Sequence, residues 1–166
     1  MRNVDVVLNE IVELRRKGFS FLALADDNFY PVAKKDLEMA ARREDKTHLH
    51  ELEEMRAERF ELMAKLAKLP SDTIFFTQIT MEAAEDPEFL EAMRKANIKG
   101  ALVGVEAVTP EGLKDIYKDF NLSGNALAER LRVFRQHGVH VLGSVIFGLP
   151  SDTSATFDAT AALAEA

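Results

Sequence analysis

The sequence contains no cysteine. This absence excludes disulfide bonds, thiol nucleophiles and thiolate metal ligands together. No apolar run approaches the ~18 residues that a membrane-spanning helix needs, and no signal peptide precedes the first predicted helix, so we expect a cytoplasmic protein. The formal net charge of -7 and the lack of a clustered basic face argue against a nucleic-acid partner.

Several catalytic and cofactor motifs are missing as well. No G-x-G-x-x-G follows the first predicted strand, which disfavours a dinucleotide-binding Rossmann unit. No serine lies in a G-x-S-x-G context, which disfavours a hydrolase. His48 and His50 are two residues apart on a predicted helix and therefore point to different sides, and His137 and His140 flank a helix–strand junction. We therefore predict no metal site.

What is present is an alternation of helices and strands in a chain of 166 residues, the length of one domain. Apolar spacing predicts a first helix over 4–17, ended by Gly18. Later helices start at Pro87, after Thr109 and at about 125, and a last helix begins within 151–166. Continuous apolar runs predict strands buried on both faces, over 21–25, 73–80, 100–108 and 139–150. This order is typical of an α/β fold with about four parallel strands, either an open doubly wound sheet or a partial, TIM-like (β/α) barrel.

Two further expectations concern packing. A long charged helical region spans roughly 34–69, and its charge pattern over 42–61 indicates a solvated face or, alternatively, an interaction surface. The aromatic residues at the starts of the first two strands, namely Phe19, Phe21, Phe75 and Phe76, are expected in the core.

Each predicted strand ends in polar or small residues. Any one of these ends is compatible with an ordinary turn. In a parallel sheet, however, all four ends lie at one edge, which is the layout of an α/β ligand site. The groups are Asp26, Asp27 and Asn28 after the first strand, Gln78, Thr80 and Glu82 after the second, Glu106 after Gly104 in the third, and Gly148, Ser151, Asp152 and Thr153 after the fourth.

Glu106 is the most informative of these residues because a free carboxylate near the end of a buried strand is costly. It either caps the next helix from the rim or accepts hydrogen bonds from the hydroxyls or amine of a ligand. Gly104, Gly143 and Gly148 either let a flat ligand approach the backbone or serve helix–strand packing.

The segments ADDNFY, GVEAVTPEGL and GSVIFGLPSDT, taken in this order, resemble the radical S-adenosylmethionine (radical SAM) superfamily. The likeness is to the class that carries a cobalamin-binding domain and includes oxidative magnesium-protoporphyrin ester cyclases. It covers nearly all of the chain and includes the D-P-E-x-L-like stretch that begins at Asp86. The last motif, G-x-x-I-x-G-L-P-x-D-T, comprises Gly143, Ile146, Gly148, Leu149, Pro150, Asp152 and Thr153.

The resemblance implies a six-stranded partial (β/α) barrel in which residues 1–166 form the central part of the catalytic domain, from the second strand to the fifth helix. It implies S-adenosylmethionine across the strand ends, with Asp26, Asp27 and Asn28 at the methionine amino group. Gln78 would lie beside them. Glu106 would hold the ribose or the methionine moiety, and Ile146, Gly148 and Leu149 would pack on the adenine. It further implies a 4Fe–4S cluster and, from the likeness alone, cobalamin in the full-length parent.

The departure from the family is the cluster loop. The family needs C-x-x-x-C-x-x-C, whose thiolates hold the iron, and this sequence has none. We therefore expect a chain that is inactive alone, being an excised piece, half of a split enzyme or a truncated relic, with the N-terminal cluster segment of the parent as a partner. The alternative is a non-catalytic α/β binding or assembly module. In either case unpaired sheet edges predict a homo-oligomer. An unrelated phosphate- or metal-dependent barrel is the third possibility, but its motifs are missing.

Overall fold

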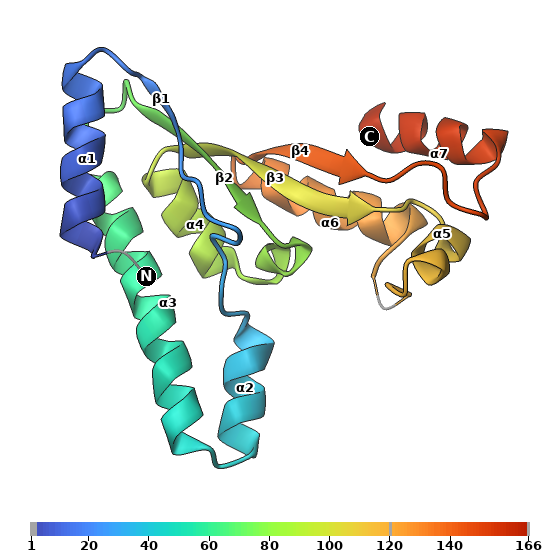
Figure 1. Cartoon of the computed structure of the whole chain (residues 1–166), viewed down its shortest axis with the longest axis horizontal. Helices are drawn as coiled ribbons and strands as arrows, with labels where there is room; N and C mark the ends of the chain where they lie inside the picture. The colour runs from blue at the N-terminus through green and yellow to red at the C-terminus, as the bar shows by residue number, and fades with distance from the viewer. Residues whose placement is uncertain (1–2, 120, 166) are drawn as a thin grey trace.

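Four parallel strands form one sheet in the order β1-β2-β3-β4, as the alternation of elements predicts (Figure 1). The computed structural model describes residues 3–119 and 121–165. Consecutive strands are neighbours, and within these residues β1 and β4 are not paired with each other, so the sheet is an open part of a (β/α) barrel. The strands are β1 Phe21–Ala23, β2 Ile74–Ile79, β3 Ile98–Glu106 and β4 His140–Val145.

Helices connect the strands, and two of them start as their capping residues predict. Asp86 Oδ1 accepts from Phe89 N (3.2 Å) and Thr109 Oγ1 accepts from Gly112 N (3.1 Å), in each case just before a proline. Within the described ranges, no helix has the length and apolarity needed to cross a membrane. The helices are α1 Val4–Arg16, α2 Lys34–Arg42, α3 Lys46–Leu66, the 3₁₀ helix η1 Met81–Glu85, α4 Pro87–Lys95, α5 Pro110–Asp115, α6 Gly124–Gln136 and α7 Ser154–Glu165.

Among the described residues, helices cover only one face of the sheet. Helix α4 packs on β3, α6 packs on β4, and α3 packs on α4 (Figure 1). Side chains on this face are buried, with Phe75 at 1% exposure. The other face is open: Phe21 is 58% exposed and Leu142 is 59% exposed. The expectation that Phe75 lies in the core is confirmed, and Phe76 is half-buried. The same expectation for Phe19 and Phe21 is wrong because no described element packs over them.

The first and fourth strands are shorter and less buried than predicted. Strand β1 comprises three residues rather than 21–25, and it is an edge strand paired with β2 alone. Strand β4 ends at Val145 rather than 150. Beyond it, Ile146 N donates to Glu106 O (2.7 Å), and Gly148 has φ +91°, a backbone conformation that cannot continue a strand. The prediction that both strands are buried on two faces is therefore wrong.

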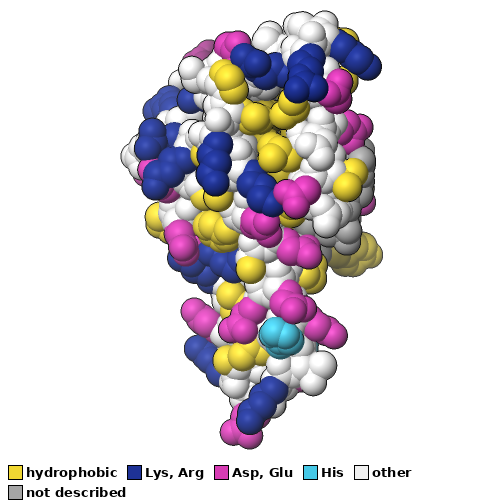
Figure 2. Space-filling model, turned by 90° about the vertical axis from the view of Figure 1, so that its left-hand side faces the viewer, with side chains coloured by type: hydrophobic (Ala, Val, Ile, Leu, Met, Phe, Trp, Pro, Cys, Tyr) yellow, Lys and Arg dark blue, Asp and Glu magenta, His cyan; other side chains and the backbone are white. Residues whose placement is uncertain are grey.

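The charged region predicted as one helical stretch is a hairpin of two helices. It turns at Arg43–Asp45, where Glu44 has φ +56°, and α2 packs against α3. The hairpin projects away from the sheet (Figure 1). Figure 2 shows mixed charges along it and hydrophobic side chains exposed among basic ones nearer the sheet. Pairs such as Lys65–Glu61 (2.7 Å) support the solvated face, but Arg59 is only 4% exposed.

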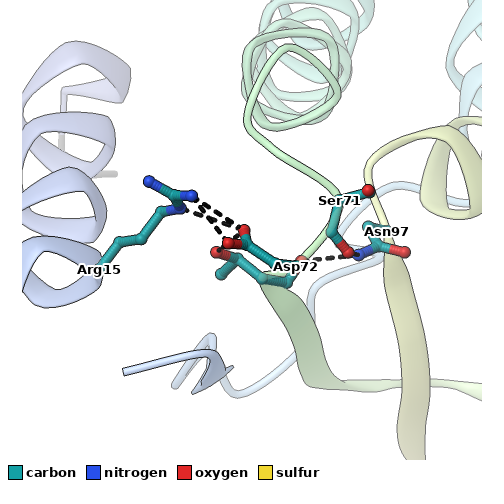
Figure 3. Close-up of polar contacts among 5 residues, drawn as sticks. Arg15, Ser71, Asp72 and Asn97 are labelled. Atoms are coloured by element: carbon teal, nitrogen blue, oxygen red, sulfur yellow. Dashed lines mark hydrogen bonds and ion pairs between the residues drawn. The ribbon is translucent and has the colours of Figure 1, made fainter. Parts of the chain in front are cut away.

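The amino edge of the sheet is fixed by structural contacts (Figure 3). Arg15 of α1 donates from Nη2 to both carboxylate oxygens of Asp72, at 2.8 and 3.1 Å, just before β2. Asn97, just before β3, donates from its side-chain amide to Ser71 O (3.1 Å) and Thr73 O (2.6 Å). These contacts fix how α1 and the strand starts are arranged, and the carboxyl edge is left for a site.

Two grooves flank the outer strands. One lies between α1 and β1, with a volume of about 530 Å³, and its walls include Ile11, Leu22 and Leu62. The other lies among β4, α6 and α7, with a volume of about 320 Å³, and its walls include Val141 and Leu163. Both are mainly apolar and both border the open edges of the sheet.

Candidate ligand site at the carboxyl edge of the sheet

The parallel sheet places the four polar strand ends along one edge. Neighbouring strands lie about 4.8 Å apart, so the outer two ends are about 14 Å apart. Backbone hydrogen bonds join the ends in pairs: Phe29 N donates to Gln78 O (2.7 Å) and Ile146 N donates to Glu106 O (2.7 Å). The predicted residues thus form two groups, one around the loop after β1 and one around the ends of β3 and β4.

In the first group, the two adjacent aspartates have different surroundings. Asp26 Oδ2 accepts from Arg59 Nη2 at 2.8 Å. Asp27 is exposed, and its carboxylate has no hydrogen-bond or ion-pair partner in the part of the chain that the structure describes. Both aspartates border the groove beside β1. Asp27 is therefore the aspartate that is free to bind a ligand.

Asn28 shapes the same loop. Its Oδ1 accepts from Tyr30 N (3.0 Å) and its Nδ2 donates to Tyr30 O (2.7 Å), which is a local side-chain turn. The Asn28 amide is thus committed to the backbone, while the neighbouring Gln78 side chain is exposed at the end of β2. These contacts are compatible both with an ordinary turn and with a ligand-binding loop.

Beneath the loop lies a buried ionic cluster centred on Asp86, which is 0% exposed. Its carboxylate contacts Arg56 Nη1 (2.6 Å) and Lys34 Nζ (3.1 Å), and it accepts from the Tyr30 hydroxyl (3.1 Å). Burial by itself raises the pKa of Asp86, but the contacts with the positively charged Arg56 and Lys34 outweigh burial and hold that pKa below its usual value. Burial, followed by the Asp86 charge, raises the pKa of Tyr30 to about 12.

In the second group, Glu106 has φ +70° and folds its side chain over Gly104. A Cβ at position 104 would lie 2.8 Å from Glu106 Oε1, so a larger residue there would displace the end of the Glu106 side chain. The same Oε1 accepts from Lys118 Nζ at 2.7 Å. Helix α5 is capped by Thr109 and not by Glu106, so the contact that the structure shows for Glu106 is with a lysine.

The loop after β4 is held by two local hydrogen bonds and one long-range hydrogen bond. Gly148 N and Leu149 N donate to Asp152 Oδ2, at 2.8 and 2.9 Å. Ser151 N donates to Asp115 Oδ2 (2.9 Å), and the hydrogen bonds from Ser151 lower the pKa of Asp115. Ile146 is 39% exposed, so the segment offers an apolar surface beside Glu106.

The chemistry of these groups suits a ligand with an amine at one end and an apolar ring at the other. The carboxylate of Asp27 and the amide of Gln78 can accept from an ammonium group, and the unbonded oxygen of Glu106 can accept from hydroxyls. Among the described residues, no three His, Asp or Glu side chains are grouped to hold a metal ion. The donor set therefore fits an organic cation and does not fit an iron–sulfur cluster, which needs thiolates.

The sequence did not predict that four side chains contribute to this edge. They are Arg56, Arg59, Lys118 and Asp86, the last as the centre of the buried ionic cluster. Arg56 and Arg59 are three residues apart and next to the apolar Phe60, so helical spacing alone was a signal that they share a face near the core. For Lys118, the sequence offers no such signal.

An open (β/α) barrel with polar strand ends at one edge defines the class of protein, and comparisons with known proteins identify the family. A family model described as the radical SAM superfamily matches residues 1–164. The hopanoid C-2 methylase of Rhodopseudomonas palustris (strain TIE-1) is 35% identical over 100 residues, which are 58% of this chain and 19% of the methylase. The chain thus spans about a fifth of that relative.

Two solved structures share the fold. The radical S-adenosylmethionine methyltransferase TsrM from Kitasatospora setae, with cobalamin and a 4Fe–4S cluster bound, has a TM-score of 0.62 and 17% identity, and the match covers 99% of this chain and 29% of that one. The cobalamin-dependent S-adenosylmethionine radical enzyme OxsB, with aqua-cobalamin bound, has a TM-score of 0.68 and 13% identity, with 99% and 22% covered. The chain belongs to the radical SAM superfamily, as its motifs indicate.

Proposed function

We propose that this chain forms the part of a radical SAM catalytic domain that holds S-adenosylmethionine, corresponding to the second to fifth strands of a six-stranded partial barrel. The observation that carries the proposal is the alignment of four strand ends at one edge, with free acceptors at one end of the row and an apolar loop at the other. Family membership gives this edge its ligand class.

In this proposal, different residues bind different parts of S-adenosylmethionine. Asp27 and Gln78 would bind the methionine ammonium group, supported by the loop that Asp26 and Asn28 shape. Glu106, held by Lys118, would accept from the ribose hydroxyls or the methionine moiety. Ile146, Gly148 and Leu149 would form the adenine surface. S-adenosylmethionine bound in this family supplies the 5'-deoxyadenosyl group for radical chemistry.

The chain itself supplies no thiolate for a 4Fe–4S cluster. Cluster binding therefore belongs, in this proposal, to another segment of a longer parent, and the 166 residues alone would bind S-adenosylmethionine without cleaving it. The methylase and methyltransferase names of the relatives favour cobalamin-assisted methyl transfer as the activity of the parent.

The direct test is equilibrium binding of S-adenosylmethionine to the 166-residue chain by isothermal titration calorimetry. We expect Asp27→Asn and Glu106→Gln each to weaken binding about tenfold, the loss of one charge-assisted contact. Glu53→Gln, on the exposed side of α3, is the matched control and should change nothing. Absence of binding by the unmodified chain up to about 1 mM, a threshold of weak affinity, would contradict the proposal.

The open edges of the sheet favour a second function, as an assembly module. We propose that the apolar grooves beside β1 and β4 bury against further strands, either from a longer parent or from a second copy. Sedimentation velocity over a range of concentrations tests self-association. A clean monomer at high concentration would exclude the second copy.

A further inference from the structure

Helix α3 contacts the ligand loop after β1 through two arginines on one face. Arg59 is 4% exposed, donates to Asp26 and lies over the Phe29 ring, with its guanidinium carbon 4.3 Å from the ring centre. Arg56 pairs with Asp86, which also accepts from the hydroxyl of Tyr30. Both ends of the segment 26–30 are therefore tied to α3, one directly and one through Asp86.

Burial makes the Arg59–Asp26 contact difficult to exchange. The Arg59 Nε atom is buried and has no hydrogen-bond partner in the described part of the chain, so Asp26 is the only carboxylate shown to compensate this guanidinium. Removing one partner of a buried ion pair leaves an uncompensated charge, which is strongly unfavourable. Asp26 is thus held by α3 and is not free to turn toward a ligand, whereas Asp27, the next residue, has no such partner.

We propose that Arg59, assisted by Arg56, is a positioning residue: it holds Asp26 so that the loop 26–30 presents Asp27 at the carboxyl edge. The proposal rests on the S-adenosylmethionine site proposed above. It gives the charged helical region 42–61 a function, because α3 is then a rigid support for the ligand loop rather than a solvated spacer.

The two adjacent aspartates provide a matched pair of variants in the full 166-residue chain. Hydrogen exchange by mass spectrometry reads the mobility of the peptide 24–32, and calorimetric titration with S-adenosylmethionine reads binding. We expect Asp26→Asn to speed exchange in this peptide about tenfold and to weaken binding, with β3 unchanged. Asp27→Asn should weaken binding without altering exchange.

Two substitutions test Arg59, one that removes its charge and one that keeps it. Arg59→Met should reproduce the effect of Asp26→Asn, and combining the two changes should add little, because both remove one interaction. Arg59→Lys, which keeps the charge, should restore most of the protection of the loop. Arg16→Met, which removes an exposed arginine paired with Glu13, is the control for loss of a helical charge.

The outcomes separate the two proposals. Equal exchange behaviour of Asp26→Asn and Asp27→Asn would overturn the positioning role, whatever the chain binds. If Arg59→Met does not fold, the comparison of Asp26→Asn with Asp27→Asn decides the question alone. If the unmodified chain binds no S-adenosylmethionine but Asp26→Asn and Arg59→Met loosen the loop, the ligand assignment fails and the hold of α3 on the loop stands.

Discussion

The loops that follow β1 and β4 carry the two halves of the predicted site, yet they are held in different ways. The loop after β1 is tied to α3 and α4 by buried charges, through Arg59 and through the cluster around Asp86. The loop after β4 is held by exposed contacts, from Gly148 N and Leu149 N to the nearby Asp152 and from Ser151 N to Asp115, 36 residues away in sequence. Buried charges therefore fix the loop after β1, while the side-chain contacts that hold the loop after β4 lie in exposed surroundings.

The largest expected effect comes from removing the centre of the buried cluster. Asp86→Ala leaves Arg56 and Lys34 without their shared carboxylate and removes the cap of α4, so we expect a loss of about 3–5 kcal/mol in the free energy of unfolding. Asp152→Ala, the equivalent change in the other loop, should cost only about 1 kcal/mol. Urea unfolding of both variants measures the difference, and similar losses would break the comparison.

Acid should weaken the buried cluster beneath the loop after β1. The pKa of Asp86 is held below its usual 3.8 in the folded protein, so its ionised form contributes stability that is fully present above about pH 4. That contribution is lost as pH falls through the lowered pKa. Unfolding experiments between pH 5 and 2 should therefore show a fall in stability that is smaller in Asp86→Asn. A variant whose acid profile matches that of the unmodified protein would contradict this role.

Small effects are expected throughout the loop after β4. Gly148 has φ +91° and open space where a Cβ would lie, so Gly148→Ala costs backbone strain alone, about 1–2 kcal/mol. Gly18→Ala is a matched control, since Gly18 has φ +93° and similarly open surroundings at the other side of the molecule. Both should lower stability alike in urea, but only Gly148→Ala should speed hydrogen exchange in the peptide 146–152.

Much of the fold was predictable because its signals are local. The cap residues Asp86 and Thr109, each followed by proline, fixed two helix starts, and apolar runs located all four strands. The predicted lengths of β1 and β4 were wrong, because both strands are shorter than their apolar runs. An apolar run does not reveal whether a strand has neighbours on both sides or helices on both faces. In the part of the chain that the structure describes, β1 and β4 have neither.

What the sequence by itself determined is the order of elements, the parallel sheet and therefore the edge at which Asp27, Gln78, Glu106 and Ile146 lie, because each of these follows from the pattern of a few adjacent residues. Only the tertiary structure decided which aspartate is free. The partner of Asp26 is 33 residues away, and the partner of Tyr30 is 56 residues away. Contacts over such separations depend on how helices pack across the sheet, where the burial of a charge selects one partner among many that the sequence allows.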